Sequence, residues 1–243
     1  MDPNRYLEAI HTHGSRLADG AEAAGLDAVV PSCPGWTVTD LVGHVDTVCQ
    51  FWAAIASGAL ADPADFVPRP DGPPAGVVDG FRAEVDSLVG VLAPLDPAQP
   101  CWTWTDDHTV GFVQRRLAHE LAVHGWDATA ARGQAIPIEA DLAVDGVDEY
   151  LDVFVPTNAA HADGVALSGH LHATDADGEW LVATGDGAWR VERAHAKGDV
   201  AIRGTASDLV ALLWGRRSID GGQFEVFGDA DSLGGFLTRL SLG

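Results

Sequence analysis

A glutamate and a histidine four positions apart, Glu120 and His124, are the residue pair of this sequence best placed to do chemistry together. Apolar residues recur around them at intervals of three and four, a pattern that predicts a helix. Side chains four residues apart project from one face of a helix, so a carboxylate and an imidazole one turn apart form half of a metal site. The zinc-protease pattern H-E-x-x-H needs a histidine where Val123 stands, and that class of protease is therefore excluded.

A further ligand must come from another element, and we expect His44 to supply it. Its segment is also predicted to be helical, because Leu41 and Val45 form an apolar stripe beside it. Helices of a bundle can direct His44, Glu120 and His124 toward one point. Two histidines and one glutamate with an open fourth position are typical of a catalytic zinc site. The alternative is an ion pair between Glu120 and His124 within one helix, with His44 as a hydrogen-bonded core residue.

Predicted helices position these side chains. Thr37 and Asp40 have the spacing of a capping box and mark the start of the helix that carries His44. Four helices within roughly the first 135 residues predict a four-helix bundle. The predicted helices span Pro3 to Ala24, Thr37 to about Ser57, Val77 to Leu92, and a last segment through Glu120 and His124 that ends near Gly133.

The hydrophobic pattern changes after Pro137 to one typical of strands and short helices. A helix is predicted from about Asp141 to Val155, and residues 165–174 then alternate between apolar and polar, as in a strand with one wet face. Asp177-Gly178 and Asp186-Gly187 are typical of hairpin turns, and the strands they join predict an antiparallel meander. Further strands are predicted at 180–184, 189–193, 200–203 and 224–227, with helices at 207–213 and 232–240.

The predicted fold class is therefore α+β. We expect two domains, a four-helix bundle over residues 1–135 and a smaller α+β domain over residues 136–243. The segment from Gly133 to Pro137 has the character of a linker between them.

Several other reactive or aromatic side chains are given structural interpretations. We expect His170 and His172 to be surface residues, because no carboxylate or third histidine lies close to them in the sequence. Cys33 is expected to have a packing role, since no neighbouring lysine, arginine or histidine lowers the pKa of its thiol. Trp102 and Trp104, which precede the last bundle helix, either wall a pocket or close the end of the bundle.

Composition and charge narrow the class of protein. The chain of 243 residues has 36 acidic and 14 basic side chains, a formal net charge of −22. Such a charge disfavours nucleic acids and anionic membranes as partners. No apolar run approaches the ~18 residues of a membrane helix and no signal peptide opens the chain, so we expect a soluble, cytoplasmic protein. The three cysteines lack paired metal spacing and are odd in number, which argues against a disulfide framework.

Two segments resemble the signatures of one family, the mycothiol-dependent maleylpyruvate isomerases and their relatives. Residues 33–44, CPGWTVTDLVGH, are similar to the amino-terminal signature, and residues 116–127, RLAHELAVHGWD, are similar to the second. The resemblance covers most of the chain and implies a DinB-like four-helix bundle followed by a domain similar to sterol carrier proteins. It also implies a divalent metal ion, commonly Zn²⁺, on His44, Glu120 and His124, with mycothiol as the thiol cosubstrate.

The resemblance also implies a chemistry. A bound cation favours a thiolate over a thiol, and the thiolate is the nucleophile. A thiolate that adds to an activated double bond, permits rotation and leaves gives cis–trans isomerisation, whereas one that attacks and stays gives thiol S-transfer. The implied partners are a small-molecule electrophile and a low-molecular-weight thiol, for a monomer or homodimer. A metal-dependent hydrolase that uses a metal-bound water, and a non-catalytic binding protein on the same fold, are the alternatives.

Members of this family also use an arginine of the second domain near the active site. Arg203 and Arg216 are the candidate catalytic residues here, with Arg217 next in the chain. The acidic chain repels a thiol or substrate that bears carboxylates, and a planar guanidinium can bind a carboxylate through two hydrogen bonds. The sequence does not single out one of the three, and for each the alternative is a surface arginine with a structural role.

Overall fold

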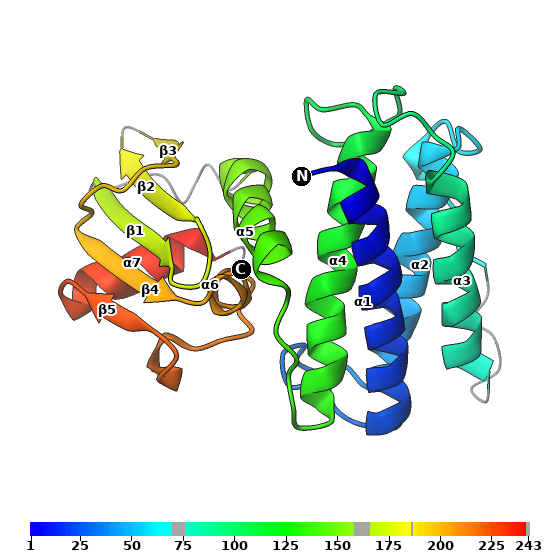
Figure 1. Cartoon of the computed structure of the whole chain (residues 1–243), viewed down its shortest axis with the longest axis horizontal. Coiled ribbons are helices and arrows are strands. Elements are labelled where there is room, and N and C mark those ends of the chain that lie inside the picture. The colour runs from blue at the N-terminus through cyan, green and yellow to red at the C-terminus, as the bar shows by residue number, and fades with distance from the viewer. Residues whose placement is uncertain (70–75, 158–165, 186, 242–243) are drawn as a thin grey trace. The chain divides into compact units, whose positions relative to one another are not determined.

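The structure of the protein, a computed structural model, describes residues 1–69, 76–157, 166–185 and 187–241. The chain divides into two compact units, Met1–Ile136 and Pro137–Gly243, each with a buried core of its own (Figure 1). Val165 of the first predicted strand and Asp186 of the second predicted turn lie outside the described residues. No helix within the described ranges combines the length and the apolar character that a membrane-spanning helix needs.

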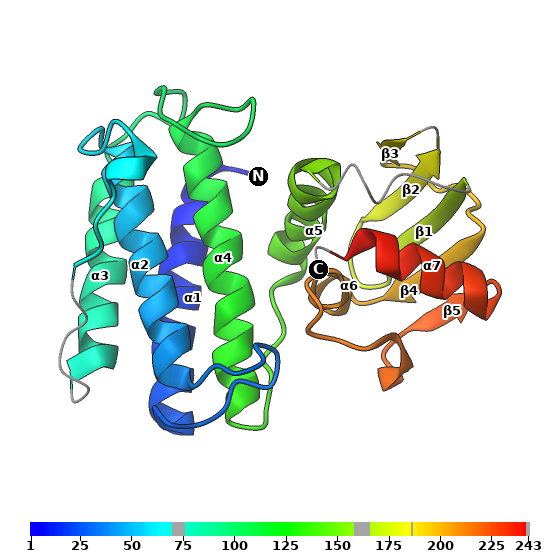
Figure 2. The same cartoon turned by 180° about the vertical axis from the view of Figure 1, so that it is seen from behind.

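The first unit is a four-helix bundle, as predicted. It consists of α1 (Pro3–Ala24), α2 (Val38–Ala56), α3 (Val77–Leu92) and α4 (Val110–Ala131), with a short 3₁₀ turn, η1 (Pro63–Asp65). Helix α1 lies beside α3 and α4, and α2 lies beside the same two helices (Figure 1 and Figure 2). Buried leucines fill the space between them, among them Leu17, Leu41, Leu88 and Leu121.

Side-chain caps define the starts of the two helices that carry the candidate ligands. At α2, the Thr37 hydroxyl accepts a hydrogen bond from the backbone N–H of Asp40, and the Asp40 carboxylate accepts one from the backbone N–H of Thr37. The predicted capping box is thus confirmed. At α4, the Thr109 hydroxyl accepts a hydrogen bond from the backbone N–H of Phe112. Each helix therefore begins at a defined residue, which sets where the candidate ligands lie along it.

The second unit combines a sheet with helices, which confirms the predicted α+β fold class. Its helices are α5 (Ala140–Glu149), α6 (Ala206–Leu213) and α7 (Ala230–Leu240), and its strands are β1 (Leu167–Ala173), β2 (Glu179–Gly185), β3 (Ala188–Glu192), β4 (Val200–Gly204) and β5 (Glu225–Phe227), with a 3₁₀ turn, η6 (Ile219–Gly221). The strands form one sheet in the order β3-β2-β1-β4-β5. Helices α6 and α7 cover one face of this sheet (Figure 2), where Gly169 of β1 leaves room for the ring of Phe236.

The first predicted helix of this unit is shorter than expected. The segment predicted as helix over 141–155 is α-helical only as far as Glu149. It continues as a π-helix, η3 (Tyr150–Phe154), and ends in a 3₁₀ turn, η4 (Val155–Thr157). Pro156 has no backbone N–H, and in a continuing α-helix its ring would clash with a carbonyl of the preceding turn, so a regular α-helix cannot extend through this position.

The predicted antiparallel meander is wrong in one pairing. Strand β2 pairs antiparallel with both β1 and β3, but β1 and β4 pair in parallel, with Leu171 opposite Ile202. Residues 193–199 connect β3 to β4 and are long enough to carry the chain back across the sheet. A tight turn would instead have placed β4 beside β3.

Candidate metal centre

The three predicted ligands meet where α2 faces α4. The Nε2 atom of His44 lies 3.3 Å from Oε1 of Glu120, and Nε2 of His124 lies 3.3 Å from the same oxygen. The two imidazole rings stand edge to face with centroids 5.2 Å apart. The donor atoms of all three residues lie within 4.8 Å of one another. The structure thus brings His44, Glu120 and His124 into one cluster, partly exposed at His44 and buried at His124.

A buried carboxylate fixes the orientation of His124. Its Nδ1 lies 2.9 Å from Oδ2 of Asp127, one turn further along α4, and Asp127 is 0% exposed. The Ser32 hydroxyl donates to the other oxygen of Asp127 at 2.5 Å. Because an ionised carboxylate only accepts, a hydrogen stays on Nδ1 and Nε2 faces Glu120. The sequence analysis assigned Asp127 no role, although its spacing of three from His124 on a helix is the signal for this contact.

Arg116 and Trp36 also contact the cluster. Nη2 of Arg116 donates to Oε2 of Glu120 at 3.1 Å, and Arg116 is only 4% exposed. The ring of Trp36 lies 5.0 Å from the ring of His44. Arg116 therefore occupies one carboxylate oxygen and leaves Oε1 to the two histidines. Neither residue was predicted to hold a ligand, and for Arg116 the available signal is its spacing of four from Glu120.

The charges of the cluster couple Glu120 to His124. Burial alone would raise the pKa of Glu120, but interactions with His124 and His44 hold it well below its usual range. Burial alone would lower the pKa of His124, but its contacts with Asp127 and Glu120 raise it to about 9. In the metal-free chain, His124 is therefore an imidazolium between two carboxylates at neutral pH. A cation that binds here has to displace the proton on Nε2.

The donor set fits a zinc ion. A tetrahedral shell with bonds of ~2.0–2.1 Å has edges of ~3.3–3.4 Å. The two histidine–Glu120 separations are each 3.3 Å, so these donor atoms already have the spacing of such a shell. Imidazole and carboxylate ligands also suit zinc by type, and three protein ligands leave a fourth position for a small molecule.

Cys33, for which we expected a packing role, lies beside the cluster. Its Sγ is 3.7 Å from Oδ2 of Asp127, and the thiol is partly exposed. Cys33, His124 and Asp127 form a second group of donor atoms within 4.8 Å of one another. The turn that precedes α2, in which Gly35 adopts a φ of 85°, places the cysteine there.

The two tryptophans before α4 pack against Trp52 of α2. Trp102 stacks on Trp52 with ring centroids 6.2 Å apart, and Trp104 lies 5.6 Å from the same ring. Trp52 follows His44 by two helical turns on α2, roughly 12 Å along the axis at ~1.5 Å per residue. Both rings stay exposed, at 40% for Trp102 and 42% for Trp104, so the two alternatives that the sequence left open remain.

A cavity of about 520 Å³ opens between α2 and α3. Gly43 and Asp46 line it from α2, and Phe81 and Glu84 line it from α3. His44, Glu120 and His124 do not belong to its lining, although Gly43, the neighbour of His44, does.

The candidate arginines lie in the second unit, and each has a partner there. Nη1 of Arg203 lies 2.8 Å from Oε2 of Glu225. Arg216 donates to the backbone carbonyl of Trp214 at 2.7 Å and lines a cavity of about 550 Å³. Arg217 bonds a carboxylate of α6 at 3.0 Å. A part in catalysis for Arg203 or Arg216 stays a prediction.

Comparison with known proteins identifies both units. The family profile for the mycothiol maleylpyruvate isomerase N-terminal domain matches residues 7–129, and the profile for the MDMPI C-terminal domain matches residues 141–235. A crystal structure of the mycothiol-dependent maleylpyruvate isomerase aligns with a TM-score of 0.63 at 12% identity, over 93% of this chain and 93% of that chain. A histidine-to-alanine mutant of the same enzyme aligns with a TM-score of 0.57 at 11% identity, over 87% of this chain and 88% of that chain. No curated protein matches the sequence.

Proposed function

This chain belongs to the mycothiol maleylpyruvate isomerase family, and from that membership we propose that it catalyses a thiol-dependent cis–trans isomerisation of a small electrophile. The observation that carries the proposal is the cluster of His44, Glu120 and His124, with both imidazole Nε2 atoms 3.3 Å from one carboxylate oxygen. The solved relative with the same fold is named for mycothiol and maleylpyruvate. We therefore propose mycothiol as the thiol, and a compound whose double bond is conjugated to a carbonyl as the substrate class.

In this proposal, His44, Glu120 and His124 hold a divalent cation, with zinc the ion that the donor set favours. When bound, the cation supplies positive charge that favours the thiolate form of the cosubstrate over the thiol. Asp127 keeps the hydrogen of His124 on Nδ1, and Arg116 keeps the second oxygen of Glu120 occupied. Both contacts preserve the direction of the donor atoms while a ligand exchanges at the open position.

The proposed reaction is balanced without an oxidant or reductant. The thiolate sulfur adds to one carbon of the double bond, and the electron pair of that bond moves onto the conjugated carbonyl. The remaining single bond rotates. The same carbon–sulfur bond then breaks as the double bond re-forms in the trans arrangement, and the thiolate is recovered.

The test uses the full chain, stripped of metal with a chelator and reconstituted with Zn²⁺. Conversion of maleylpyruvate is followed with and without mycothiol, and we expect turnover only when both thiol and metal are present. His44→Ala and His124→Ala should each lower kcat/KM by about 100-fold or more, because the activation of the thiol is lost. His11→Ala is the matched control, since His11 is a histidine of α1 whose side chain is 60% exposed.

The outcomes separate the alternatives. Activity on an ester or amide without any thiol would indicate a metal-dependent hydrolase on the same donor set. Binding of metal and thiol without turnover on a panel of electrophiles would indicate a binding protein. A carbon–sulfur product that accumulates would indicate an S-transferase in place of an isomerase.

A further inference from the structure

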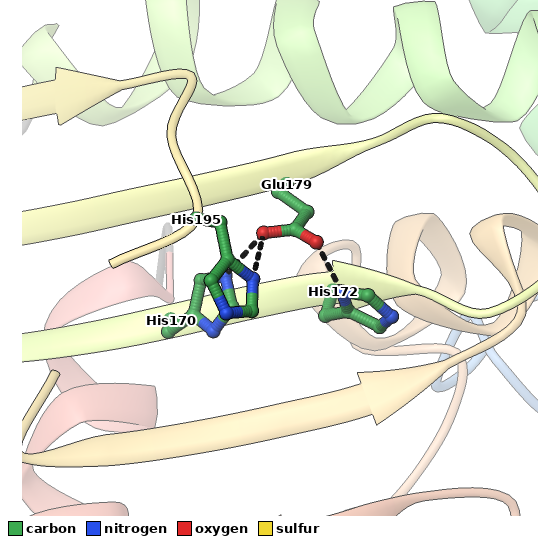
Figure 3. A group of neighbouring side chains, drawn as sticks. All are labelled: His170, His172, Glu179 and His195. Atoms are coloured by element: carbon green, nitrogen blue, oxygen red, sulfur yellow. Dashed lines mark hydrogen bonds and ion pairs between the residues drawn. The ribbon is translucent and has the colours of Figure 1, made fainter. Parts of the chain in front are cut away.

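Three histidines of the second unit gather around the carboxylate of Glu179 (Figure 3). Oε2 of Glu179 lies 3.2 Å from Nε2 of His170 and 2.5 Å from Nδ1 of His195. Oε1 of the same residue lies 2.8 Å from Nδ1 of His172. Three imidazoles thus share a single carboxylate, and Figure 3 shows all three rings directed toward it.

The topology of the sheet creates this cluster. Alternation along β1 places His170 and His172 on one face, and the antiparallel register of β1 and β2 sets Glu179 directly opposite His172. His195 comes from residues 193–199, the segment that leads back to β4. The interpretation as a surface residue is therefore wrong for His170, whereas the side chain of His172 is still 24% exposed. His170 is 8% exposed. Glu179 supplies the carboxylate, because the hairpin turn brings β2 back beside β1.

We propose that His170, His172, Glu179 and His195 form a second divalent metal site, independent of the centre in the bundle. Their donor atoms lie within 4.8 Å of one another. Three imidazole nitrogens and one carboxylate oxygen make a complete four-coordinate set for zinc or a related first-row metal. Mg²⁺ and Ca²⁺ prefer shells of oxygen ligands, so the nitrogen-rich set discriminates against them.

The geometry requires little rearrangement. The separations between Glu179 and the histidines, 2.5–3.2 Å, are within about 1 Å of the ~3.3 Å edge of a zinc tetrahedron. All donor atoms lie within 4.8 Å of one another, so no separation has to close by more than roughly 1.5 Å to reach that edge. The side chain of His195 is 81% exposed, so its rotation can supply this movement without disturbing the core.

A cation also has routes into the cluster. A cavity of about 470 Å³ is lined by Glu179, His195 and Asp177, and another of about 440 Å³ by His170, His195 and Asp199. Each cavity also has one basic residue in its lining, Arg193 and Lys197 respectively, but the net charge of −22 raises the concentration of cations around the chain as a whole. A metal bound by all four residues would cross-link the β1–β2 hairpin to the segment before β4.

The experiment isolates this site in the full chain. A His44→Ala/His124→Ala double variant removes the bundle centre, and the metal-free protein is dialysed against Zn²⁺ and then analysed for metal by mass spectrometry. We expect about one equivalent of zinc to remain, and Co²⁺ in its place to show the ligand-field absorption of a tetrahedral site. Adding His195→Ala or His172→Ala should weaken this binding by at least about tenfold.

Matched controls keep the result specific. Lys197→Ala changes the same segment as His195, and Glu192→Gln removes one exposed carboxylate from neighbouring β3 as Glu179→Gln does from β2. In the bundle double variant, both controls should retain the one remaining equivalent of zinc, and Glu179→Gln should lose it. The proposal is overturned if the bundle double variant binds no zinc, or if His195→Ala, a mild change at an exposed position, leaves the affinity unchanged. Neither result bears on the thiol-dependent activity, which is measured on the chain with its bundle centre intact.

Discussion

Asp127 acts on the candidate centre through His124, whose Nδ1 it holds at 2.9 Å. Replacement by asparagine keeps the shape of the side chain but removes the charge that keeps a hydrogen on Nδ1. We expect Asp127→Asn to weaken zinc binding at the bundle by about 10–100-fold. Competition with a chromophoric chelator measures this affinity, in a chain that also carries Glu179→Gln so that only the bundle centre is observed.

Ser32→Ala is the matched control for this change. It removes a hydrogen bond to the other oxygen of Asp127 and leaves the contact with His124 in place. A hydrogen bond to a charged group contributes about 1.5–3 kcal/mol, but this bond reaches the metal centre only through Asp127, so the loss of metal affinity should stay below about tenfold. If the zinc affinity of Asp127→Asn lies within twofold of that of the unmodified chain, Asp127 has no part in metal binding at this centre.

Residues that share a helix were the easiest to predict as a group. The spacing of Glu120 and His124 places both on one face, and this needs no knowledge of the tertiary structure. Asp127 has the same helical relation to His124, at a spacing of three residues. Its role was not predicted, because the sequence alone does not show that this carboxylate is buried and hydrogen-bonded to His124. Glu179 shows a different limit of prediction from sequence. Its position opposite His172 depends on the register of two strands, and the alternation of apolar and polar residues does not determine that register.

At the scale of the elements, the crossing of α1 and α3 depends on a glycine. A Cβ added at Gly14 would lie 2.6 Å from Cγ1 and 2.8 Å from Cγ2 of Val85, a buried β-branched side chain. We expect Gly14→Ala to destabilise the bundle by about 1–3 kcal/mol, because overpacking outweighs a gain of ~1 kcal/mol in helix propensity. Urea unfolding followed by circular dichroism measures the change.

For Gly90→Ala, on α3, we expect the opposite change in the free energy of unfolding. A Cβ at Gly90 meets nothing within 4 Å, so the substitution should stabilise the bundle by about 0.4–1 kcal/mol. Two changes of the same type should therefore move the free energy of unfolding in opposite directions. A stabilising Gly14→Ala would show that α1 and α3 are packed less closely than the structure has them.

The elements of the two units differ in how far local sequence determines them. The bundle helices follow from apolar periodicity and from caps such as Thr37, which act within a few residues. In the second unit, the alternation of β1 indicates a strand but not its neighbours, and the parallel pairing with β4 joins segments about 30 residues apart. Such pairings depend on the connection between the strands, where hydrophobic patterning carries little information.

For the molecule as a whole, the net charge of −22 affects which ligands approach. Cations are attracted to both clusters of imidazole and carboxylate, while a thiol or substrate that bears carboxylates is repelled unless a local cation offsets the field. Arg116, which lies at the bundle centre, already pairs with Glu120. We therefore keep the expectation that an arginine of the second unit, Arg203 or Arg216, assists catalysis.

This expectation leads to a prediction about the two units. Residues 1–136 form a compact unit with a core of their own, so we expect this fragment to fold and to bind zinc at His44, Glu120 and His124. The fragment should nevertheless lose thiol-dependent turnover, because the arginine of the second unit that we expect to assist catalysis is missing. In the full chain, Arg203→Ala or Arg216→Ala should lower kcat/KM by at least about tenfold, equivalent to ~1.4 kcal/mol in the transition state.

The controls decide whether such a loss reflects the arginine or the domain. Arg190→Ala removes an exposed guanidinium from β3 and should leave kcat/KM within twofold. Arg203 forms an ion pair with Glu225, and Glu225→Gln removes the charge of that partner while keeping the arginine. If Arg203 assists catalysis, kcat/KM of Glu225→Gln should not fall. A fragment of residues 1–136 that turns over as fast as the full chain would make the second unit dispensable for catalysis.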